Sequence, residues 1–147
     1  MRMLEVEVQV EIRPTEDEEK VKKAVERFFK VNWISMDDYK FTKIYRGVGR
    51  GLEAIEGFYH ALRKQQILDA ARQYLFRGKG EEFVRFYLNK QVAFAGSISF
   101  CSYEYGESPL GAITVIIKTR EVEKLIEWLT PRTVKGKPIE TGEPPDP

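Results

Sequence analysis

The side chains best able to do chemistry in this sequence are cations and amides in two central segments. The first spans residues 63–66 and reads Arg-Lys-Gln-Gln, and the second spans residues 89–91 and reads Asn-Lys-Gln. If a helix begins near Gln65, its free N–H groups and its dipole favour an anion, which the preceding Arg63 and Lys64 neutralise. The amides of the second segment offer the two-sided hydrogen bonding that base edges require. Both segments indicate a phosphate-bearing partner.

A purely structural interpretation of the two segments stays open. Residues 63–66 also fit a solvated junction between two helices, and residues 89–91 also fit a hairpin turn. Arg72 stands further along the predicted helix, where Asp69 offers it a partner three residues away on the same surface.

A glycine-rich stretch, Gly47-Val-Gly-Arg-Gly51, follows a predicted strand and precedes a predicted helix. A dinucleotide-binding fingerprint needs glycine where Leu52 stands, and a P-loop needs a Gly-Lys pair followed by Ser or Thr, which this sequence lacks. We therefore expect a bulged strand end rather than a phosphate-cradling loop. Arg46 and Arg50 flank the stretch and stay candidates for contact with a polyanion.

Catalytic and metal chemistry find little support in the residue inventory. The single histidine, His60, and the single cysteine, Cys101, cannot form a Cys/His zinc cluster or an intramolecular disulfide. A lone cysteine in an apolar strand is usually an inert buried group. The carboxylates concentrate on expected strand faces and helix starts, where solvation and capping explain them. We predict no catalytic residue, no metal site and no cofactor.

The composition limits the class of protein. The chain has 147 residues, of which 42% are hydrophobic and 32% charged, as in one globular domain. Collagen-like, coiled-coil and disordered classes are excluded. The apolar runs fall far short of the roughly 20 residues that span a bilayer, and the N-terminal residues do not form the apolar stretch of a signal peptide. We expect a cytoplasmic protein with no membrane partner.

Charge is distributed unevenly along the chain. The net formal charge is +1, yet residues 39–100 carry +6 and are flanked by stretches of −3 and −2. The same central stretch contains 12 of the 18 aromatic residues. Groups that neutralise phosphates and groups that stack on bases therefore coincide there, although burial in the core explains many of these aromatic rings equally well.

Periodicity predicts an α+β domain. Residues 4–12 alternate apolar and polar as a half-buried strand does, and Pro14 ends it. A helix should begin at Glu16, because Thr15 and Glu18 have the spacing of a capping box. A short strand is expected at residues 33–34, a turn at 37–38 and a strand at about 39–48.

The second half of the chain reads as further helices and strands. Residues 52–76 are helical in two phases, so we expect a kink or two helices meeting at residues 63–66. Residues 81–100 should form two strands, or a strand and an irregular piece, divided at residues 89–90. A turn at 108–111, a strand at 113–117 and a helix at about 120–129 follow. The sequence therefore predicts one two-layer α+β domain over residues 1–133, with a mostly antiparallel sheet and helices packed on one face. Residues 134–147 are expected to be a loose polar tail.

Five blocks of sequence, in order, resemble an archaeal family known as uncharacterised protein family 0201 (UPF0201), or domain of unknown function 54. The blocks are RPTEDEEKVKKAV, LRKQQILDAAR, FYLNKQVAFAG, SPLGAITV and IEWLTPRTVKGKPI, and they extend from Leu4 to about Ile139. The resemblance implies a fold similar to large-subunit ribosomal protein number five, which holds 5S RNA, and a role in RNA binding with a link to RNA-processing machinery. It supplies no catalytic motif. It also marks family-pattern positions for ligand contact: Arg63, Lys64, Gln65, Asn89, Lys90, Gln91, Pro131 and Arg132.

Our leading hypothesis is a non-catalytic RNA-binding protein that contacts phosphates through the central basic stretch. The first alternative is a protein-interaction subunit of a larger assembly, with a homodimer also open, and the second is a small enzyme whose site is assembled from distant residues. The candidate RNA-contacting residues are Arg46, Arg50, Arg63, Lys64, Gln65, Arg72, Asn89, Lys90, Gln91 and Arg132.

Overall fold

A curved antiparallel sheet organises the protein. The structure, a computed structural model, describes residues 4–39, 41–102, 111–140 and 143–145. Six strands pair in the order β2-β3-β1-β6-β4-β5. They are β1 (Glu5–Ile12), β2 (Asn32–Tyr39), β3 (Thr42–Arg50), β4 (Phe83–Asn89), β5 (Phe100–Cys101) and β6 (Ala112–Lys118).

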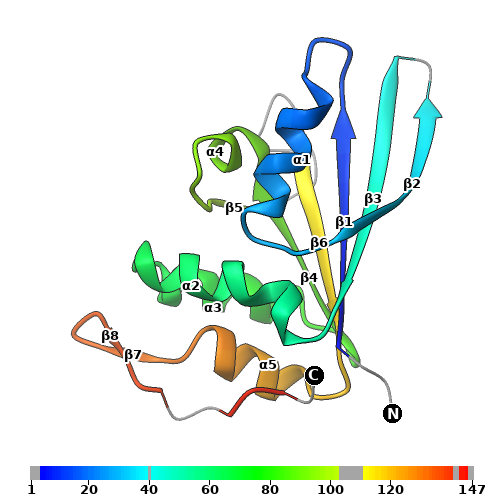
Figure 1. Cartoon of the computed structure of the whole chain (residues 1–147). Coiled ribbons are helices and arrows are strands. Elements are labelled where there is room, and N and C mark those ends of the chain that lie inside the picture. The colour runs from blue at the N-terminus through cyan, green and yellow to red at the C-terminus, as the bar shows by residue number, and fades with distance from the viewer. Residues whose placement is uncertain (1–3, 40, 103–110, 141–142, 146–147) are drawn as a thin grey trace.

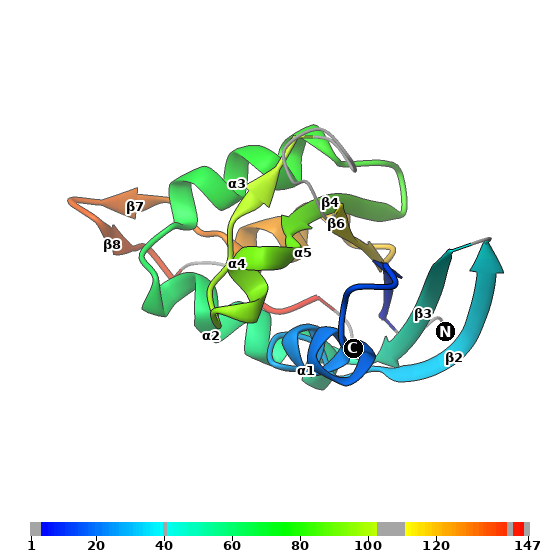
Figure 2. The ribbon, with the colours of Figure 1, turned by 90° about the horizontal axis from the view of Figure 1, so that it is seen from above.

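The helices gather on one side of this sheet (Figure 1). They are α1 (Glu18–Glu26), the 3-10 turn η1 (Leu52–Ile55), α2 (Glu56–Lys64), α3 (Leu68–Arg77), α4 (Lys90–Phe94) and α5 (Val122–Leu129). A separate two-stranded ribbon, β7 (Thr133–Val134) and β8 (Lys137–Pro138), follows α5. Seen from above, the β2–β3 hairpin projects away from the helices (Figure 2). The predicted α+β class and the mostly antiparallel sheet are confirmed, whereas the likeness to the 5S-RNA-binding ribosomal protein stays a prediction.

The alternating side chains of the central strand β1 give the sheet one face that packs against the helices and one face that does not. Val6, Val8 and Val10 are at most 1% exposed and face the helices, while the alternate side chains face away from them. Across the core, Phe58 of α2 stacks between Phe29 and Phe86, with ring centroids 5.2 and 5.1 Å away. The predicted strand over residues 4–12 is confirmed.

The first helix begins two residues later than its capping box predicts. Asp17 is the N-cap, and its Oδ1 accepts hydrogen bonds from the backbone N–H groups of Glu19 (3.0 Å) and Lys20 (3.4 Å). A carboxylate at this position satisfies the orphan donors as well as a Thr hydroxyl does. The carboxylate of Glu16 is instead directed into the protein, where it pairs with Lys90.

The turn predicted at residues 37–38 is wrong, because β2 continues through both aspartates to Tyr39 before the chain reverses. The bulge expected at residues 47–51 is also absent, since β3 pairs with β1 in unbroken register there. The irregularity lies in β2 instead, between Trp33 and Ser35. An added Cβ on Gly49 would overlap the carbonyl oxygen of Lys30, so this glycine permits a close approach of two backbones.

The two-phase helix over residues 52–76 is confirmed as separate helices. Helix α2 ends at Lys64, Gln66 adopts a positive φ of 57°, and α3 starts at Leu68. Beyond β4, the segment predicted as strand or irregular piece contains the short helix α4. The predicted turn at 108–111 lies outside the described residues except for Gly111. No helix in the described ranges is long and apolar enough to cross a bilayer, and the cytoplasmic location stays a prediction.

The C-terminal segment, predicted to be loose, makes contacts in its described part. Glu140 pairs with Arg63 at 2.9 Å, and Pro145 is buried.

Deleting residues 140–147 should therefore lower the free energy of unfolding by about 2 kcal/mol, because a half-exposed ion pair contributes up to about 1 kcal/mol and burial of a small apolar ring a similar amount. Urea denaturation measures this loss. Glu140→Ala alone should lower the free energy of unfolding by less than about 1 kcal/mol. If the deletion has no effect on stability, residues 134–147 are a loose tail and the domain ends at residue 133, as the sequence predicts.

Candidate nucleic-acid interface

Arg63, in the donor-rich segment at residues 63–66, makes its hydrogen bonds within the protein. The guanidinium of Arg63 donates to the carbonyl oxygens of Trp128 (3.0 Å) and Leu129 (3.2 Å) at the end of α5. It also lies 3.6 Å from the centre of the Tyr59 ring. The last carbonyls of a helix have no partner within it, so this side chain completes α5 and fastens α2 to it.

Two other predicted contact residues have the same kind of structural role. Arg72 donates to the Glu127 carboxylate through both terminal guanidinium nitrogens, at 2.6 and 3.1 Å, and donates to the Thr130 carbonyl at 2.8 Å. The hydrogen bond from Arg72 lowers the pKa of Glu127. The Gln65 amide exchanges hydrogen bonds with the backbone of Ile98, at 2.8 and 3.0 Å. The donors of both side chains are directed toward protein carbonyls or a carboxylate.

The second predicted segment, residues 89–91, is the start of α4. Asn89 caps this helix by accepting from the Val92 N–H at 3.0 Å. Lys90 is 0% exposed, and its ammonium donates to the Glu11 carbonyl and to the Glu16 carboxylate at 3.0 Å. Burial lowers the pKa of Lys90, and the Glu16 carboxylate opposes this shift. The prediction that Lys90 contacts phosphate is corrected, because an enclosed ammonium with two protein partners does not reach a surface ligand.

The remaining sequence candidates lie at the surface. Lys64, Gln91 and Arg132 are exposed. On the face of the sheet opposite the helices, Arg46 hydrogen-bonds Glu7, and Arg50 lies 3.7 Å from Glu5. The structure therefore does not gather the ten predicted residues into one site.

Glu7, on the same face of the sheet, forms close ion pairs with two cations. Its side chain is 9% exposed between Arg46 and Lys118, whose ammonium is 3.5 Å away. Burial raises the pKa of Glu7, but the hydrogen bond and charge of Arg46, helped by Lys118, outweigh it, so the pKa lies below its ordinary value. Arg46 is thus committed to a neighbouring carboxylate.

His60 and Cys101 have different surroundings. The His60 ring is 66% exposed on α2, 3.6 Å from Glu56, whereas Cys101 is buried on β5. Across the described ranges, no three His, Cys, Asp or Glu side chains are grouped to hold a metal ion.

A basic hollow that the sequence analysis missed lies between α3 and β4. The chain leaves α3 through Gly78 and turns straight back into β4. The Gly78 carbonyl accepts from the Arg85 N–H at 2.9 Å, and the Gly80 N–H donates to the Phe83 carbonyl at 2.8 Å. An added Cβ on Gly78 would overlap the Arg85 carbonyl oxygen. The absence of a side chain at Gly78 therefore lets the end of α3 lie against the backbone of β4 at Arg85, and the side chains of Arg77 and Arg85 line one hollow.

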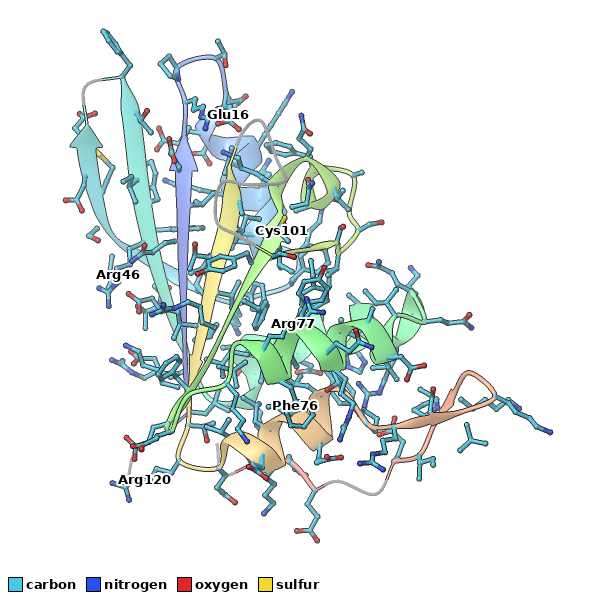
Figure 3. All side chains as sticks on the ribbon, turned by 180° about the vertical axis from the view of Figure 1, so that it is seen from behind. Glu16, Arg46, Phe76, Arg77, Cys101 and Arg120 are labelled. Carbon is cyan, nitrogen blue, oxygen red and sulfur yellow. The ribbon has the colours of Figure 1, made fainter. Side chains whose placement is uncertain are left out.

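We call this hollow the α3–β4 pocket. Its volume is about 350 Å³. Among the described residues, its lining includes three cations, Arg77, Lys79 and Arg85, and no carboxylate. It also includes the aromatic rings of Tyr74, Phe83 and Tyr87. In Figure 3, Arg77 on α3 and Cys101 on β5 lie on the same side of the molecule, with Arg120 near the lower end. Arg46 lies on the opposite flank of the sheet in that view.

Of the three cations in the described lining, only Lys79 forms an ion pair with a described residue. Lys79 pairs with Glu123 at 2.7 Å. Arg77 and Arg85 form no ion pair with any described carboxylate, and their guanidinium carbons lie 5.1 Å from the Tyr74 ring and 5.7 Å from the Phe83 ring. A guanidinium offers a planar fork of donors that matches phosphate oxygens. The pocket can therefore accept an anion without breaking an internal ion pair of either arginine.

A sequence signal for this pocket exists. Residues 77–80 read Arg-Gly-Lys-Gly, and Phe83, Arg85 and Tyr87 alternate along β4 so that they share one face. The alternation alone could not show that the end of α3 lies against this strand, because that approach depends on the tight connection through Gly78.

Comparison with known proteins supplies the family. A family model described as RNA binding matches residues 5–119. A UPF0201 protein of Pyrobaculum aerophilum is 42% identical over 144 residues, covering 97% of this chain and all of its own length. A UPF0201 protein of Metallosphaera sedula is 40% identical over 137 residues, covering 93% and 94%. The chain belongs to the UPF0201 family.

Solved structures of this family agree with the fold. The crystal structure of the UPF0201 protein from Methanococcus jannaschii has 34% sequence identity and a TM-score of 0.78, over 92% of this chain and 98% of that one. A second match, a DUF54 protein from Methanothermobacter thermautotrophicus, is 23% identical with a TM-score of 0.54 and supports the fold alone. The names of these family members state no enzymatic activity.

Proposed function

We propose that the protein binds single-stranded RNA without catalysing a reaction, and that the α3–β4 pocket is the centre of its contact surface. The observation that carries this proposal is the pair of guanidinium groups, Arg77 and Arg85, that form no ion pair with a described residue and lie among aromatic rings in a pocket whose described lining has no carboxylate. Membership of a family whose model is described as RNA binding supports it.

The chemistry of the pocket matches single strands better than duplexes. Proteins bind single strands by combining cations that follow the backbone with aromatic rings on which bases stack. The outward face of β4 carries this combination, because Phe83 and Tyr87 flank Arg85 along the strand. In an RNA duplex the bases are stacked inside a helix, so their faces cannot reach such rings.

The surface around the pocket extends the proposed path of the strand. Arg120 is exposed just beyond β6, in a second hollow whose described lining includes Lys79 but also three glutamates, so we propose it as a peripheral contact. Arg46 and Arg50 stay proposed contacts on the outer part of the sheet, where an RNA phosphate would compete with the glutamate that already lies near each of them. Lys64, Gln91 and Arg132 stay proposed peripheral contacts. Attachment to RNA-processing machinery also stays a proposal.

The test is the salt dependence of RNA affinity. Fluorescence anisotropy with a labelled 12-nucleotide single strand, at several salt concentrations, should give a log–log slope that falls by about 1.4 in the Arg77→Ala/Arg85→Ala variant, since each lost phosphate contact removes roughly 0.7. A matched control is Lys20→Ala/Lys23→Ala on α1, which removes the same charge from two exposed residues. Its slope should equal that of the unmodified protein.

Two results would contradict the proposal. Equal losses in both double variants would show that net charge alone attracts RNA, and the pocket would lose its assigned role. If the unmodified protein binds no RNA even at low salt, the protein-interaction role takes its place. A specific observation favours that second candidate: Ile34, Met36 and Phe41 of the projecting β2–β3 hairpin are 54%, 44% and 82% exposed.

A further inference from the structure

We propose that the α3–β4 pocket holds one nucleoside monophosphate unit, with the base against Tyr87 and the phosphate between Arg77 and Arg85. This inference rests on the proposed function, in which the unit is one unstacked nucleotide of the bound strand. It adds a ligand class and a stoichiometry of one to the site. A free nucleotide presents the same chemistry, and the experiments below distinguish the two sources.

The size of the pocket favours a single unit. Small-molecule sites in proteins occupy roughly 300 to 1,000 Å³, and the volume of about 350 Å³ places this pocket at the lower end of that range. A base with its sugar and phosphate fits such a space, whereas two stacked nucleotides exceed it. The remaining nucleotides of a strand would therefore lie outside, along the open face of the sheet.

Tyr87 is the ring best placed to receive a base. Tyr74 stacks on Phe100 with centroids 5.1 Å apart, and the Arg77 guanidinium lies over it as well, so this ring already has neighbours. Phe83 closes over Gly80, whose added Cβ would overlap the phenyl ring. Tyr87 is half-buried and makes no ring contact or side-chain hydrogen bond with any described residue. Because Tyr87 also lines the pocket, a ligand held there meets this side chain.

The two arginines suit the phosphate. Arg85 extends from β4 two residues before Tyr87, so both side chains leave the same face of the strand. Arg77 approaches from the end of α3, which the hydrogen bond between Gly78 and Arg85 holds against β4. A phosphate between the two groups would receive donors from both sides, and the charge-assisted bonds would not compete with an internal ion pair.

Titration calorimetry with free ligands tests the pocket directly. Uridine 5′-monophosphate and adenosine 5′-monophosphate should each bind with a stoichiometry of one, and the matching nucleoside and inorganic phosphate should each bind at least tenfold more weakly. Arg77→Ala/Arg85→Ala should remove the advantage of the monophosphate over the nucleoside. Equal affinity for monophosphate and inorganic phosphate would overturn the inference, because the base would then contribute nothing.

Variants at aromatic residues separate base stacking from charge. Tyr87→Ala should weaken binding of the monophosphate and of the 12-nucleotide strand about tenfold, because stacking on an aromatic ring contributes about one factor of ten per base or more. It should leave the salt slope unchanged. The matched control is Phe76→Ala, which removes a 41% exposed ring of α3 that is not itself part of the described lining and meets it only at Lys79, whose ammonium lies 5.8 Å from the ring centre. Phe76→Ala should bind like the unmodified protein.

The outcomes distinguish this inference from the proposed function. If RNA binding needs Arg77 and Arg85 but free monophosphates do not bind and Tyr87→Ala has no effect, RNA binding stands and the one-nucleotide pocket is overturned. If monophosphates bind as described but no single strand binds or competes, the pocket stands and the RNA-binding proposal falls. Competition of the monophosphate with the strand, lost in Tyr87→Ala, supports both.

Discussion

Replacing Lys90 by methionine is expected to lower the free energy of unfolding by about 3 to 5 kcal/mol. The side chain is 0% exposed, and it is bonded to the Glu11 carbonyl and the Glu16 carboxylate. The Glu16 side chain is only 5% exposed, and its Oε2 has no hydrogen-bond partner among the described atoms. Without the ammonium, this carboxylate is an uncompensated charge in the interior.

The control for Lys90→Met is a second change that removes the stranded charge. In Lys90→Met/Glu16→Gln the amide oxygen can still accept from the Arg13 N–H, which bonds Glu16 at 2.9 Å. Replacing both members of a buried ion pair is often close to neutral, so the double variant should recover most of the lost stability. Guanidinium denaturation of the unmodified protein, Lys90→Met, Glu16→Gln and the double variant gives the coupling energy between the two side chains. A loss below about 1 kcal/mol in Lys90→Met would mean that water or another cation reaches Glu16.

The pair of Lys90 and Glu16 illustrates a difference between local and long-range features of the fold: only the local ones can be predicted from the sequence. The strand at residues 4–12 follows from alternation, and the junction between α2 and α3 follows from a change of helical phase, because both patterns are local. The start of α1 cannot be predicted in this way. The role of Glu16 depends on a partner 74 residues away, and a capping-box pattern contains no information about that partner. Helix α4 has only five residues, too few for a periodic signal.

The residues of the candidate site also depend on partners that are distant in the sequence. Arg63 and Arg72 look like ligand donors because the sequence shows their chemistry but not the carbonyl groups at the end of α5, which become neighbours only in the folded chain. Arg77 and Arg85 look ordinary for the opposite reason. Their availability follows from the lack of a nearby described carboxylate, and an absence of this kind in three dimensions has no sequence signature.

The second large effect is expected at Gly78, where alanine should lower the free energy of unfolding by about 3 kcal/mol. An added Cβ would overlap the Arg85 carbonyl oxygen and lie 2.8 Å from its carbon, so either α3 or β4 must move. The move would also weaken the hydrogen bond from the Arg85 N–H to the Gly78 carbonyl, at about 1 kcal/mol. The φ of Gly78 is −94°, which alanine adopts readily, so the cost comes from the overlap.

Gly80→Ala is the matched control, because there the added Cβ meets the Phe83 ring, a side chain that can rotate, instead of backbone. Gly80→Ala should cost at least about 1 kcal/mol less stability than Gly78→Ala, since a rotamer change replaces a backbone shift.

Under conditions where both variants are folded, Gly78→Ala should also bind RNA more weakly and with a flatter salt slope, because separating α3 from β4 separates Arg77 from Arg85. If Gly78→Ala keeps full stability, the close approach of α3 to β4 is wrong. If it loses stability but keeps the unmodified salt slope, the two arginines do not act together on the strand.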